Sequence, residues 1–341
     1  MSVTNDTDKA ADINVEPGPM SREWHYHPDL PVGFAPFFAW PPQSRKVVAF
    51  LWEYYLQTSD RSSFVLLAFA TFYLFQPAQA DMATLGAGWV LGALVRNYIL
   101  MLIVAGGLHL WFYGYGKQGK RLKFDPRDLS RNNRLYKFGD QVKDNMLYTL
   151  ASGVPIWTAY EVLLTWAYAS GMIPTFEFSD GWLWFIVAFP ILAIYQSFHF
   201  YCIHRLLHWP PLYTRFHSVH HRNVNVGPWS GLSMHPLEHV LYLSAILIAF
   251  VLPLHPVHML FLMYWLALGA SSSHSGYEGL WVKDKRRLLI GGFFHQLHHR
   301  YYECNYGNSE MPWDKWLGSY HDGSPEKTDE TRARRKRMYA K

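Results

Sequence analysis

Four long apolar stretches constrain the fold of this 341-residue chain more than any other feature. They cover residues 63–78, 97–115, 146–171 and 181–203, and Glu161 is the one charged side chain within them. A bilayer core roughly 30 Å thick is crossed by about 20 apolar helical residues. The last three stretches are therefore long enough to span a membrane, and the first is marginal. A further apolar pair, 240–254 and 257–270, is broken at Leu254-His255-Pro256 and predicts a helical hairpin that enters and leaves from one side.

The charge of the connecting segments alternates along the chain. Segment 117–145 holds nine Lys and Arg against four acids, whereas segments 79–88, 171–180 and 252–258 hold no Lys or Arg. Because basic loops stay on the cytoplasmic side of a membrane, we expect the N-terminus, 117–145, 204–239 and the chain after 271 to share that side. The alternative, a soluble protein with buried helices, does not explain this alternation. Arg96 is expected to mark the start of the second span, since charged groups at membrane depth lie near an end or face the bundle interior.

Composition excludes several other classes of protein. Two cysteines, Cys202 and Cys304, exclude a disulfide scaffold and a cysteine-rich zinc module. The net charge of +5 resides in loops and tail rather than on a nucleic-acid-binding face. The chain has no glycine-rich dinucleotide or phosphate-binding pattern, which argues against nicotinamide or ATP binding.

We therefore predict an all-α integral membrane bundle of about four transmembrane helices plus the hairpin, capped by a cytoplasmic helical domain. The expected parts are a polar, flexible N-terminal segment at 1–45 without a signal peptide, transmembrane helices at 46–203, a histidine-rich domain at 204–322 that includes the hairpin 240–270, and a basic tail at 323–341.

Most of the 18 histidines lie from residue 204 onward, in short groups with helical spacing. His204 and His208 are four residues apart, so they share one helix face. In His217-x-x-His220-His221 the first two histidines share a face, and the third is rotated by about 100°. One helix can therefore present this triplet to two neighbouring metal ions.

A second triplet, His295-x-x-His298-His299, repeats the same spacing. Neutral imidazole suits Zn, Cu, Fe and Ni, and this many imidazoles exceed the four ligands of a single tetrahedral site. The spacing therefore indicates two metals. His274, which follows an apolar helix where it returns to the cytoplasmic face, is predicted as a further ligand. The nine predicted ligands are His204, His208, His217, His220, His221, His274, His295, His298 and His299.

Three further residues have a less certain relation to the metals. His235 and His239 are either ligands or groups that orient ligands through their other ring nitrogen, and the second interpretation is favoured. Glu278 lies four residues after His274 and is a candidate carboxylate ligand or proton carrier. The remaining histidines are expected to be ordinary polar or core residues, namely His25, His27, His109, His199, His255, His258 and His321.

These histidine groups, in this order, resemble the fatty acid hydroxylase/sterol desaturase superfamily of membrane-bound, histidine-rich di-iron oxygenases. The resemblance covers roughly residues 180–322. Besides the histidines it includes Asn305-Tyr306-Gly307 and Trp313-Asp314-x-x-x-Gly318, and the run from His274 to Glu278 is similar to the C4-methylsterol oxidase branch. Ser197 and Cys202 depart from the family pattern, which often has Asp and Trp at those positions.

The resemblance implies O2-dependent hydroxylation or desaturation of a C–H bond in a lipid, sterol-like or fatty-acyl or sphingoid, at two Fe ions, with Zn possible in isolated protein. Electrons would come from NAD(P)H through a separate carrier such as cytochrome b5, a ferredoxin or a reductase. The implied membrane is a bacterial inner membrane or the endoplasmic reticulum. Aromatic residues are expected to line a lipid passage to the metals, among them Trp182, Trp184, Phe198, Phe200, Tyr201, Phe293 and Phe294.

Two other functions, metal transport and zinc-dependent hydrolysis, fit the histidine pattern less well. A histidine-rich metal transporter needs ligands inside the spans, whereas the groups here lie outside them. A membrane zinc hydrolase needs His-Glu-x-x-His with the Glu beside the first histidine. In His235-Pro-Leu-Glu238-His239 the Glu is beside the second histidine instead, and the triplets have no role in that chemistry.

Overall fold

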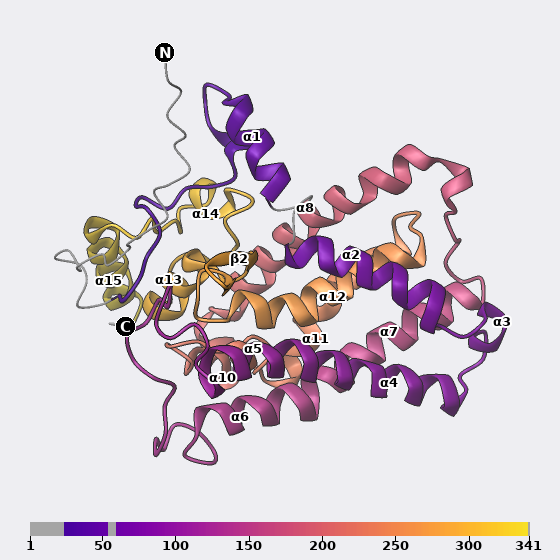
Figure 1. Ribbon diagram of the computed structural model, residues 1–341, viewed down its shortest axis with the longest axis horizontal. Helices are drawn as coiled ribbons and strands as arrows, with labels where there is room; N and C mark the ends of the chain where they lie inside the picture. The colour runs from indigo at the N-terminus through magenta and orange to yellow at the C-terminus, as the bar shows by residue number, and fades with distance from the viewer. Residues whose placement is uncertain (1–23, 54–58, 340–341) are drawn as a thin grey trace.

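The computed structural model describes residues 24–53 and 59–339. Long helices lie side by side along the molecule, and the shorter helices α13, α14 and α15 gather at one end, near the C-terminus (Figure 1). The prediction of a flexible segment at 1–45 falls partly on residues 1–23, which lie outside the described residues.

Four helical segments correspond to the predicted spans. They are α2 (Asp60–Ala70) with η3 (Thr71–Phe75); α4 (Ala87–Met101) with η4 (Leu102–Gly106), α5 (Gly107–His109) and η5 (Leu110–Gly114); α6 (Gln141–Tyr148) with η6 (Thr149–Gly153) and α7 (Val154–Ala169); and α8 (Trp182–Leu207). Among the described residues, Ala87–Gly114 and Trp182–Leu207 are long and apolar enough to cross a membrane. Residues 60–75 form a shorter helix, and the helix at 141–169 begins with a polar turn around Lys143 and Asp144.

α12 (Pro256–Ser273) is the central helix of the bundle. Every residue from Val257 to Ser272 is buried, and α12 contacts α2, α7 and α8. A helix enclosed on all sides is apolar on all sides, as this sequence is. Its antiparallel partner is α11 (Pro236–Leu243) with η10 (Ser244–Phe250), so the predicted hairpin corresponds to this helix pair, broken at 251–255.

The outer faces of the surrounding helices are apolar. Leu66 on α2, Ile103 in the α4 segment and Ile186 on α8 are each more than half exposed. Contiguous apolar surface of this kind marks a site of contact with lipid or another protein. The bundle therefore has a buried central helix and an apolar exterior.

The start of the second predicted span differs from the expectation. α4 begins at Ala87, well before Arg96, because residues 87–95 carry no charge and continue the apolar pattern. Arg96 therefore lies within the helix and forms an ion pair with Glu161 of α7. The Asn97 amide nitrogen donates to Glu161 Oε2 at 2.9 Å and to Thr158 Oγ1 at 3.1 Å. A charge at this depth is compatible with the fold because it is paired inside the bundle.

We expect Arg96→Met to lower the apparent melting temperature strongly, because the carboxylate of Glu161 then stays buried without its counter-ion, at a cost of about 3–5 kcal/mol. The double variant Arg96→Met/Glu161→Met removes both charges and should unfold at a higher temperature than the single variant. Thermal unfolding in detergent measures both. A double variant less stable than Arg96→Met would contradict the role of this ion pair.

One small sheet departs from the all-α prediction. β1 (Leu280–Val282) and β2 (Lys285–Leu288) pair antiparallel around the two-residue turn Lys283-Asp284. Both turn residues have positive φ, 52° and 58°, which is the backbone of a type I′ hairpin turn. The chain is otherwise mostly helical.

The end of the bundle that carries the histidines is built from short elements and the described part of the N-terminal segment. Trp24 is buried there, with its ring 4.9 Å from that of Phe293 and beneath the guanidinium of Arg300. This part of the predicted flexible segment is therefore packed. The other helices of the described chain, not all of which lie at this end, are η1 (Pro36–Phe38), α1 (Ser44–Leu51), α3 (Gln79–Met82), η7 (Phe178–Asp180), α9 (Pro210–Leu212), η8 (Tyr213–His217), α10 (Ser218–His221), η9 (Pro228–Ser230), α13 (Phe293–Tyr301), α14 (Trp313–Trp316) and α15 (Pro325–Tyr339).

Candidate metal centre

Four segments bring histidines together at one end of the bundle: the end of α8, the stretch from η8 through α10, the residue after α12, and α13. The fold sorts the nine predicted ligands into two groups, within each of which the candidate ligand atoms lie within 4.8 Å of one another. Cluster A consists of His204, His208, His217, His221 and His298, and cluster B of His220, His274, His295 and His299. Each triplet is thus divided between the clusters, but the partners differ from the expectation, because His217 joins His221 rather than His220, and His295 joins His299 rather than His298.

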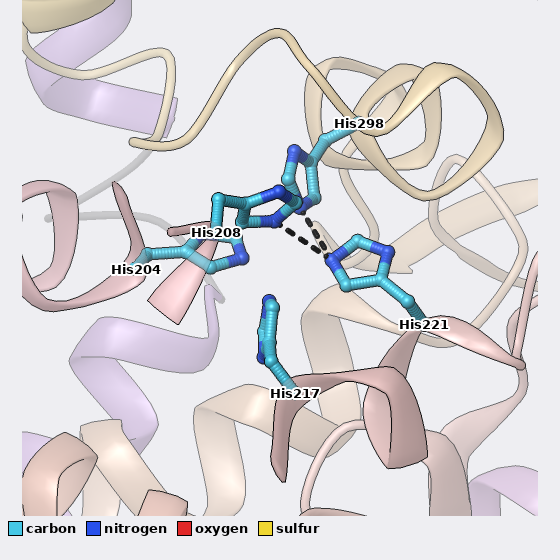
Figure 2. A group of neighbouring side chains, drawn as sticks. All are labelled: His204, His208, His217, His221 and His298. Atoms are coloured by element: carbon cyan, nitrogen blue, oxygen red, sulfur yellow. Dashed lines mark hydrogen bonds between the residues drawn. The ribbon is translucent and has the colours of Figure 1, made fainter. Parts of the chain in front are cut away.

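In cluster A the rings converge from three of these segments: the end of α8, the stretch from η8 through α10, and α13 (Figure 2). His221 Nε2 lies 3.1 Å from His208 Nε2 and 3.0 Å from His298 Nε2. The Nε2 atoms of His204 and His217 are buried and have no hydrogen-bond partner among the described residues. The cluster therefore presents nitrogen lone pairs to a common centre.

Cluster B also brings imidazole nitrogens together, but its histidines come from α10, from the residue after α12 and from α13. The Nε2 atoms of His274, His295 and His299 form a triangle with sides of 3.0, 3.1 and 3.2 Å. The ring of His220 lies 5.2 Å from that of His274 and 4.6 Å from that of His299. Three neutral imidazoles cannot all satisfy one another through their Nε2 atoms, because each ring carries a single N–H.

Hydrogen bonds on the far side of the rings fix their orientation. His204 Nδ1 and His298 Nδ1 contact the carbonyls of Tyr306 and Cys304 at 2.7 and 2.6 Å. A carbonyl only accepts, so each Nδ1 carries the proton and each Nε2 lone pair is free. This pairing of a ligand's second nitrogen with an acceptor is usual in metal sites, where it holds the ring and raises its basicity.

Two further histidines are held in the same way. His274 Nδ1 contacts the Ala270 carbonyl at 2.8 Å, and His217 Nδ1 contacts Glu238 Oε1 at 2.7 Å. Burial lowers the pKa of His274 to about 4 and that of His217 to about 3. The rings are therefore neutral at pH 7, which is the form that binds metals.

Both clusters fit metal ions by their donor spacing. Imidazole nitrogens bind zinc at about 2.0–2.1 Å, so neighbouring ligand atoms around a metal of this size lie about 2.9–3.4 Å apart. The Nε2 separations of 3.0–3.2 Å in both clusters fall in that range. An all-nitrogen donor set with converging, unpartnered lone pairs is suited to a divalent first-row metal.

The less certain residues lie outside both clusters. His235 caps α11, its Nδ1 accepting from the Leu237 amide at 3.2 Å. His239 contacts the Leu232 carbonyl at 3.0 Å and Ser152 Oγ at 3.1 Å. Neither contacts a cluster histidine. The seven histidines expected to be ordinary polar or core residues are also absent from both clusters.

Glu278 is placed differently from the expected carboxylate ligand. It belongs to neither cluster, yet its Oε2 is buried without a hydrogen-bond partner among the described residues. Burial, opposed in part by Arg286, raises the pKa of Glu278 to about 7. It can therefore gain and lose a proton at neutral pH.

The sequence did not single out several residues that hold the ligands. The sequence shows Glu238 only as part of the His235-Pro-Leu-Glu238-His239 motif, whereas in the structure its carboxylate contacts His217. Glu303 Oε1 lies 3.7 Å from His208 Nδ1, and the carbonyls of Cys304 and Tyr306 hold two other rings. A backbone carbonyl leaves no signal in the sequence, because every residue has one. Glu303 could have been identified as a candidate, because it is an acid five residues after His298.

Asp314 anchors the loop that carries those carbonyls. Its Oδ1 and Oδ2 accept from the amides of Tyr306 and Gly307, both at 2.8 Å, and Oδ1 also accepts from Ser319 Oγ at 2.7 Å. Asp314 is fully buried. The loop 303–307, which faces three rings of cluster A, is therefore fixed by one carboxylate.

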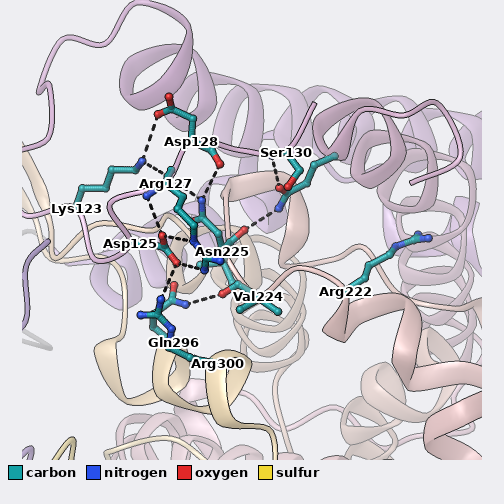
Figure 3. A network of polar contacts seen from close by, with 12 residues as sticks. Lys123, Asp125, Arg127, Asp128, Ser130, Arg222, Val224, Asn225, Gln296 and Arg300 are labelled. Atoms are coloured by element: carbon teal, nitrogen blue, oxygen red, sulfur yellow. Dashed lines mark hydrogen bonds and ion pairs between the residues drawn. The ribbon is translucent and has the colours of Figure 1, made fainter. Parts of the chain in front are cut away.

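A second polar network contacts α13 through Gln296 and Arg300 (Figure 3). Asp125 accepts from Arg127 at 2.9 and 2.5 Å and lies 3.6 Å from Arg300 of α13. Burial raises the pKa of Asp125, but the bonds from Arg127 outweigh it and the net pKa is lowered. Gln296 of α13 donates to Val224 O at 2.9 Å, and Asn225 donates to Arg127 O at 2.9 Å. The basic loop 117–145 thus holds in place the helix that bears three of the histidines.

A cavity of about 500 Å³ lies beside the two clusters. Histidines of both clusters line it, namely His204, His217, His220, His274 and His295. Of the aromatic residues predicted to line a lipid passage, Phe200, Phe293 and Phe294 do so. The other four predicted residues do not line it. Trp182 and Trp184 lie at the start of α8, more than three turns before Gln196, and Phe198 and Tyr201 lie on other faces of the helix.

Comparisons with known proteins agree with the geometry of this site. Residues 189–319 match the family model described as fatty acid hydroxylase. The Delta(7)-sterol-C5(6)-desaturase of Nicotiana tabacum is 28% identical over 246 residues, which cover 69% of this chain and 83% of that protein. A methylsterol monooxygenase of Aspergillus fumigatus is 32% identical over 166 residues, 44% of this chain and 51% of that protein.

A Delta(7)-sterol 5(6)-desaturase of Gibberella zeae is 28% identical over 149 residues, 43% of this chain, and the match spans 45% of that protein. No solved structure matches the chain. The family match and the two kinds of sterol-oxidising relative confirm the resemblance inferred from the histidine motifs. The methylsterol monooxygenase among them agrees with the similarity to the C4-methylsterol oxidase branch.

Proposed function

Because residues 189–319 match the fatty acid hydroxylase family model, we propose that this chain is a membrane-bound oxidoreductase that hydroxylates or desaturates a C–H bond of a lipid. It would use O2 and electrons supplied from outside the chain. The lipid is sterol-like or a fatty-acyl or sphingoid chain.

One observation carries this proposal: two buried, neutral histidine clusters lie side by side on the wall of one cavity. Each cluster is proposed to hold one iron ion, and zinc could replace iron in isolated protein. Bound iron would supply the activation of O2 that oxidation of an unreactive C–H bond requires.

The chain's own residues orient the site and control access to it. Acceptors at Nδ1 hold His204, His217, His274 and His298 with their Nε2 lone pairs directed inward. Apolar side chains such as Phe200, Ile203 and Leu207 line the cavity and limit the entry of water. A lipid C–H bond can therefore lie beside the histidines, against the apolar part of the cavity wall.

Glu278 is proposed as the proton carrier of the site. Its carboxylate lines the cavity, carries a buried unpartnered oxygen and has a pKa of about 7. A carboxyl group with these properties can deliver protons at neutral pH.

Electrons are proposed to come from NAD(P)H through cytochrome b5, a ferredoxin or a reductase, since the sequence lacks a nucleotide-binding pattern. We further propose that about four helices and the hairpin sit in the membrane, with the histidine end on the cytoplasmic side of a bacterial inner membrane or the endoplasmic reticulum. Two long apolar helices and the apolar exterior support this arrangement, and the basic loop 117–145 supports the orientation.

A metal transporter or a zinc hydrolase fits these observations less well. Transport requires ligands along a path through the spans, whereas both clusters lie at one end of the bundle. A hydrolase requires one metal with an open position and a nearby carboxylate base, whereas here nine histidines form two clusters.

Comparison of lipids from cells with and without the gene tests the proposed function. We expect one lipid to gain the mass of an oxygen atom or to lose that of two hydrogens, and a gained oxygen to become labelled when the cells grow under 18O2. Unchanged lipids in cells that contain folded, metal-loaded protein would overturn the proposal.

A further inference from the structure

Ser197, where the chain departs from the common family pattern, contacts the cavity wall. Ser197 is fully buried on α8, and its Oγ donates to Asn308 Oδ1 at 2.8 Å. Asn308 lines the cavity. Because its carbonyl oxygen is engaged by Ser197, the amide nitrogen of Asn308 is left to donate to a ligand.

The adjacent residue on α8 offers the complementary group. Gln196 is 5% exposed and also lines the cavity. Within the described part of the chain its Oε1 is buried without a hydrogen-bond partner. A buried amide oxygen without a partner is costly, so this atom points to a ligand that donates a hydrogen bond.

An acceptor at Gln196 and a donor at Asn308 match the chemistry of a hydroxyl group, which both donates and accepts. The protein's own side-chain charges disfavour an anion in the part of the cavity near Gln196, about 12 Å along α8 from His204, whereas the metal ions proposed for the histidine clusters would attract an anion close to them. Of the described residues that line the cavity, five are acids and one is basic: Asp29, Asp60, Glu238, Glu278 and Glu310 against Arg61. Even with Glu238 and Glu278 protonated, three carboxylates face one guanidinium, and that guanidinium is paired with Glu310 and Asp60.

We propose that Gln196 and Asn308 form a hydroxyl-recognition site that selects a neutral lipid alcohol over a lipid acid. This inference rests on the proposed function for the idea that the cavity receives a lipid. Gln196 lies two helical turns before His204 on α8, about 12 Å along the helix axis. The recognised hydroxyl therefore lies away from the carbon that faces the histidines, and binding at this site sets which carbon reaches them.

Binding of matched lipid pairs to the purified full chain in lipid nanodiscs tests the proposal. The probes are radiolabelled cholesterol against cholestene, which lacks the hydroxyl, and octadecanol against stearate. We expect wild-type protein to prefer the alcohol in at least one pair by about three- to tenfold, the size of one or two hydrogen bonds. Gln196→Met should remove that preference while leaving the affinity for cholestene unchanged.

Tyr195→Phe is the matched control, because it removes a hydroxyl from the neighbouring residue, which does not line the cavity. It should bind like wild type. Helical circular dichroism and metal content show whether Gln196→Met is folded, and Asn308→Ala provides a second variant expected to lose the same preference. Equal binding of alcohol and counterpart by the wild type, no saturable binding of either alcohol, or a preference that survives in both variants would overturn the site.

The two proposals can fail separately. Binding is measured without turnover, so a preference that depends on Gln196 stands even if no lipid is oxidised. Conversely, lipid oxidation without any such preference would leave the proposed function in place and remove the hydroxyl-recognition site.

Discussion

His298→Ala is expected to remove one of two bound metal ions and to abolish lipid oxidation. His298 is fully buried, and its Nε2 lies 3.0 Å from that of His221, at the centre of cluster A. Loss of a ligand should lower metal affinity by more than the roughly 10–100-fold typical for loss of a ligand's outer hydrogen-bond partner. Elemental analysis of purified protein should therefore fall from two metal equivalents per chain to one.

His299→Ala is the counterpart in cluster B, with its Nε2 3.0 Å from that of His274. It should also leave one equivalent, and the double variant with His298→Ala should leave none. This result separates two independent sites from one shared site, in which either single variant would lose both ions.

His235→Ala is the matched control among the histidines. Its ring lies outside both clusters and caps α11, so its removal should cost about 1 kcal/mol of stability and no metal. Two equivalents retained by folded His298→Ala, or one or fewer bound by the wild type, would contradict the assignment of one metal to each cluster.

The histidines that gather in the two clusters could be identified from the sequence because their spacing is a local property of helices. The i, i+3, i+4 pattern placed His217 and His220 on one face and rotated His221 away. The fold, however, pairs His217 with His221 in cluster A and gives His220 to cluster B. The α-helix α13 divides its triplet in the same way, with His295 and His299 in cluster B and His298 in cluster A. Residues four apart on an α-helix are rotated by about 40° and residues three apart by about 60°, so the first and last histidines of a triplet share a face more closely than the first two.

Other features depend on contacts that sequence periodicity does not encode. The sequence predicts Arg96 at the start of the second span, whereas it lies inside α4, because its partner Glu161 is distant in the chain and only the packing of α4 on α7 joins them. Likewise, carbonyls orient His204 and His298, and every residue type has a carbonyl. A sequence can thus indicate candidate ligands, whereas the groups that orient those side chains become visible only in the fold.

Asp314→Asn is expected to weaken metal binding in cluster A alone. The carboxylate accepts from the amides of Tyr306 and Gly307, one at each oxygen. Asparagine retains one acceptor oxygen and places an amide N–H₂ opposite the other backbone N–H. Because two donors cannot bond to each other, the loop 303–307 should shift, and with it the carbonyls that orient His204 and His298.

Cluster B provides the control within the same molecule. His274 is oriented by the Ala270 carbonyl of α12, which does not depend on Asp314. Metal titration of Asp314→Asn should therefore show one equivalent bound as in wild type and a second weakened by about 10–100-fold. Lipid oxidation should fall with the occupancy of the weakened site.

A general loss of structure would instead weaken both sites together and lower the helical circular dichroism. Ser319→Ala offers a milder test, since it removes one bond to Asp314 at 2.7 Å and leaves both backbone amides engaged. If metal affinity stays unchanged in Asp314→Asn while the protein remains folded, the loop does not position cluster A. If the second equivalent weakens and the first does not, the two metal sites are held by separate parts of the fold and can be tuned one at a time.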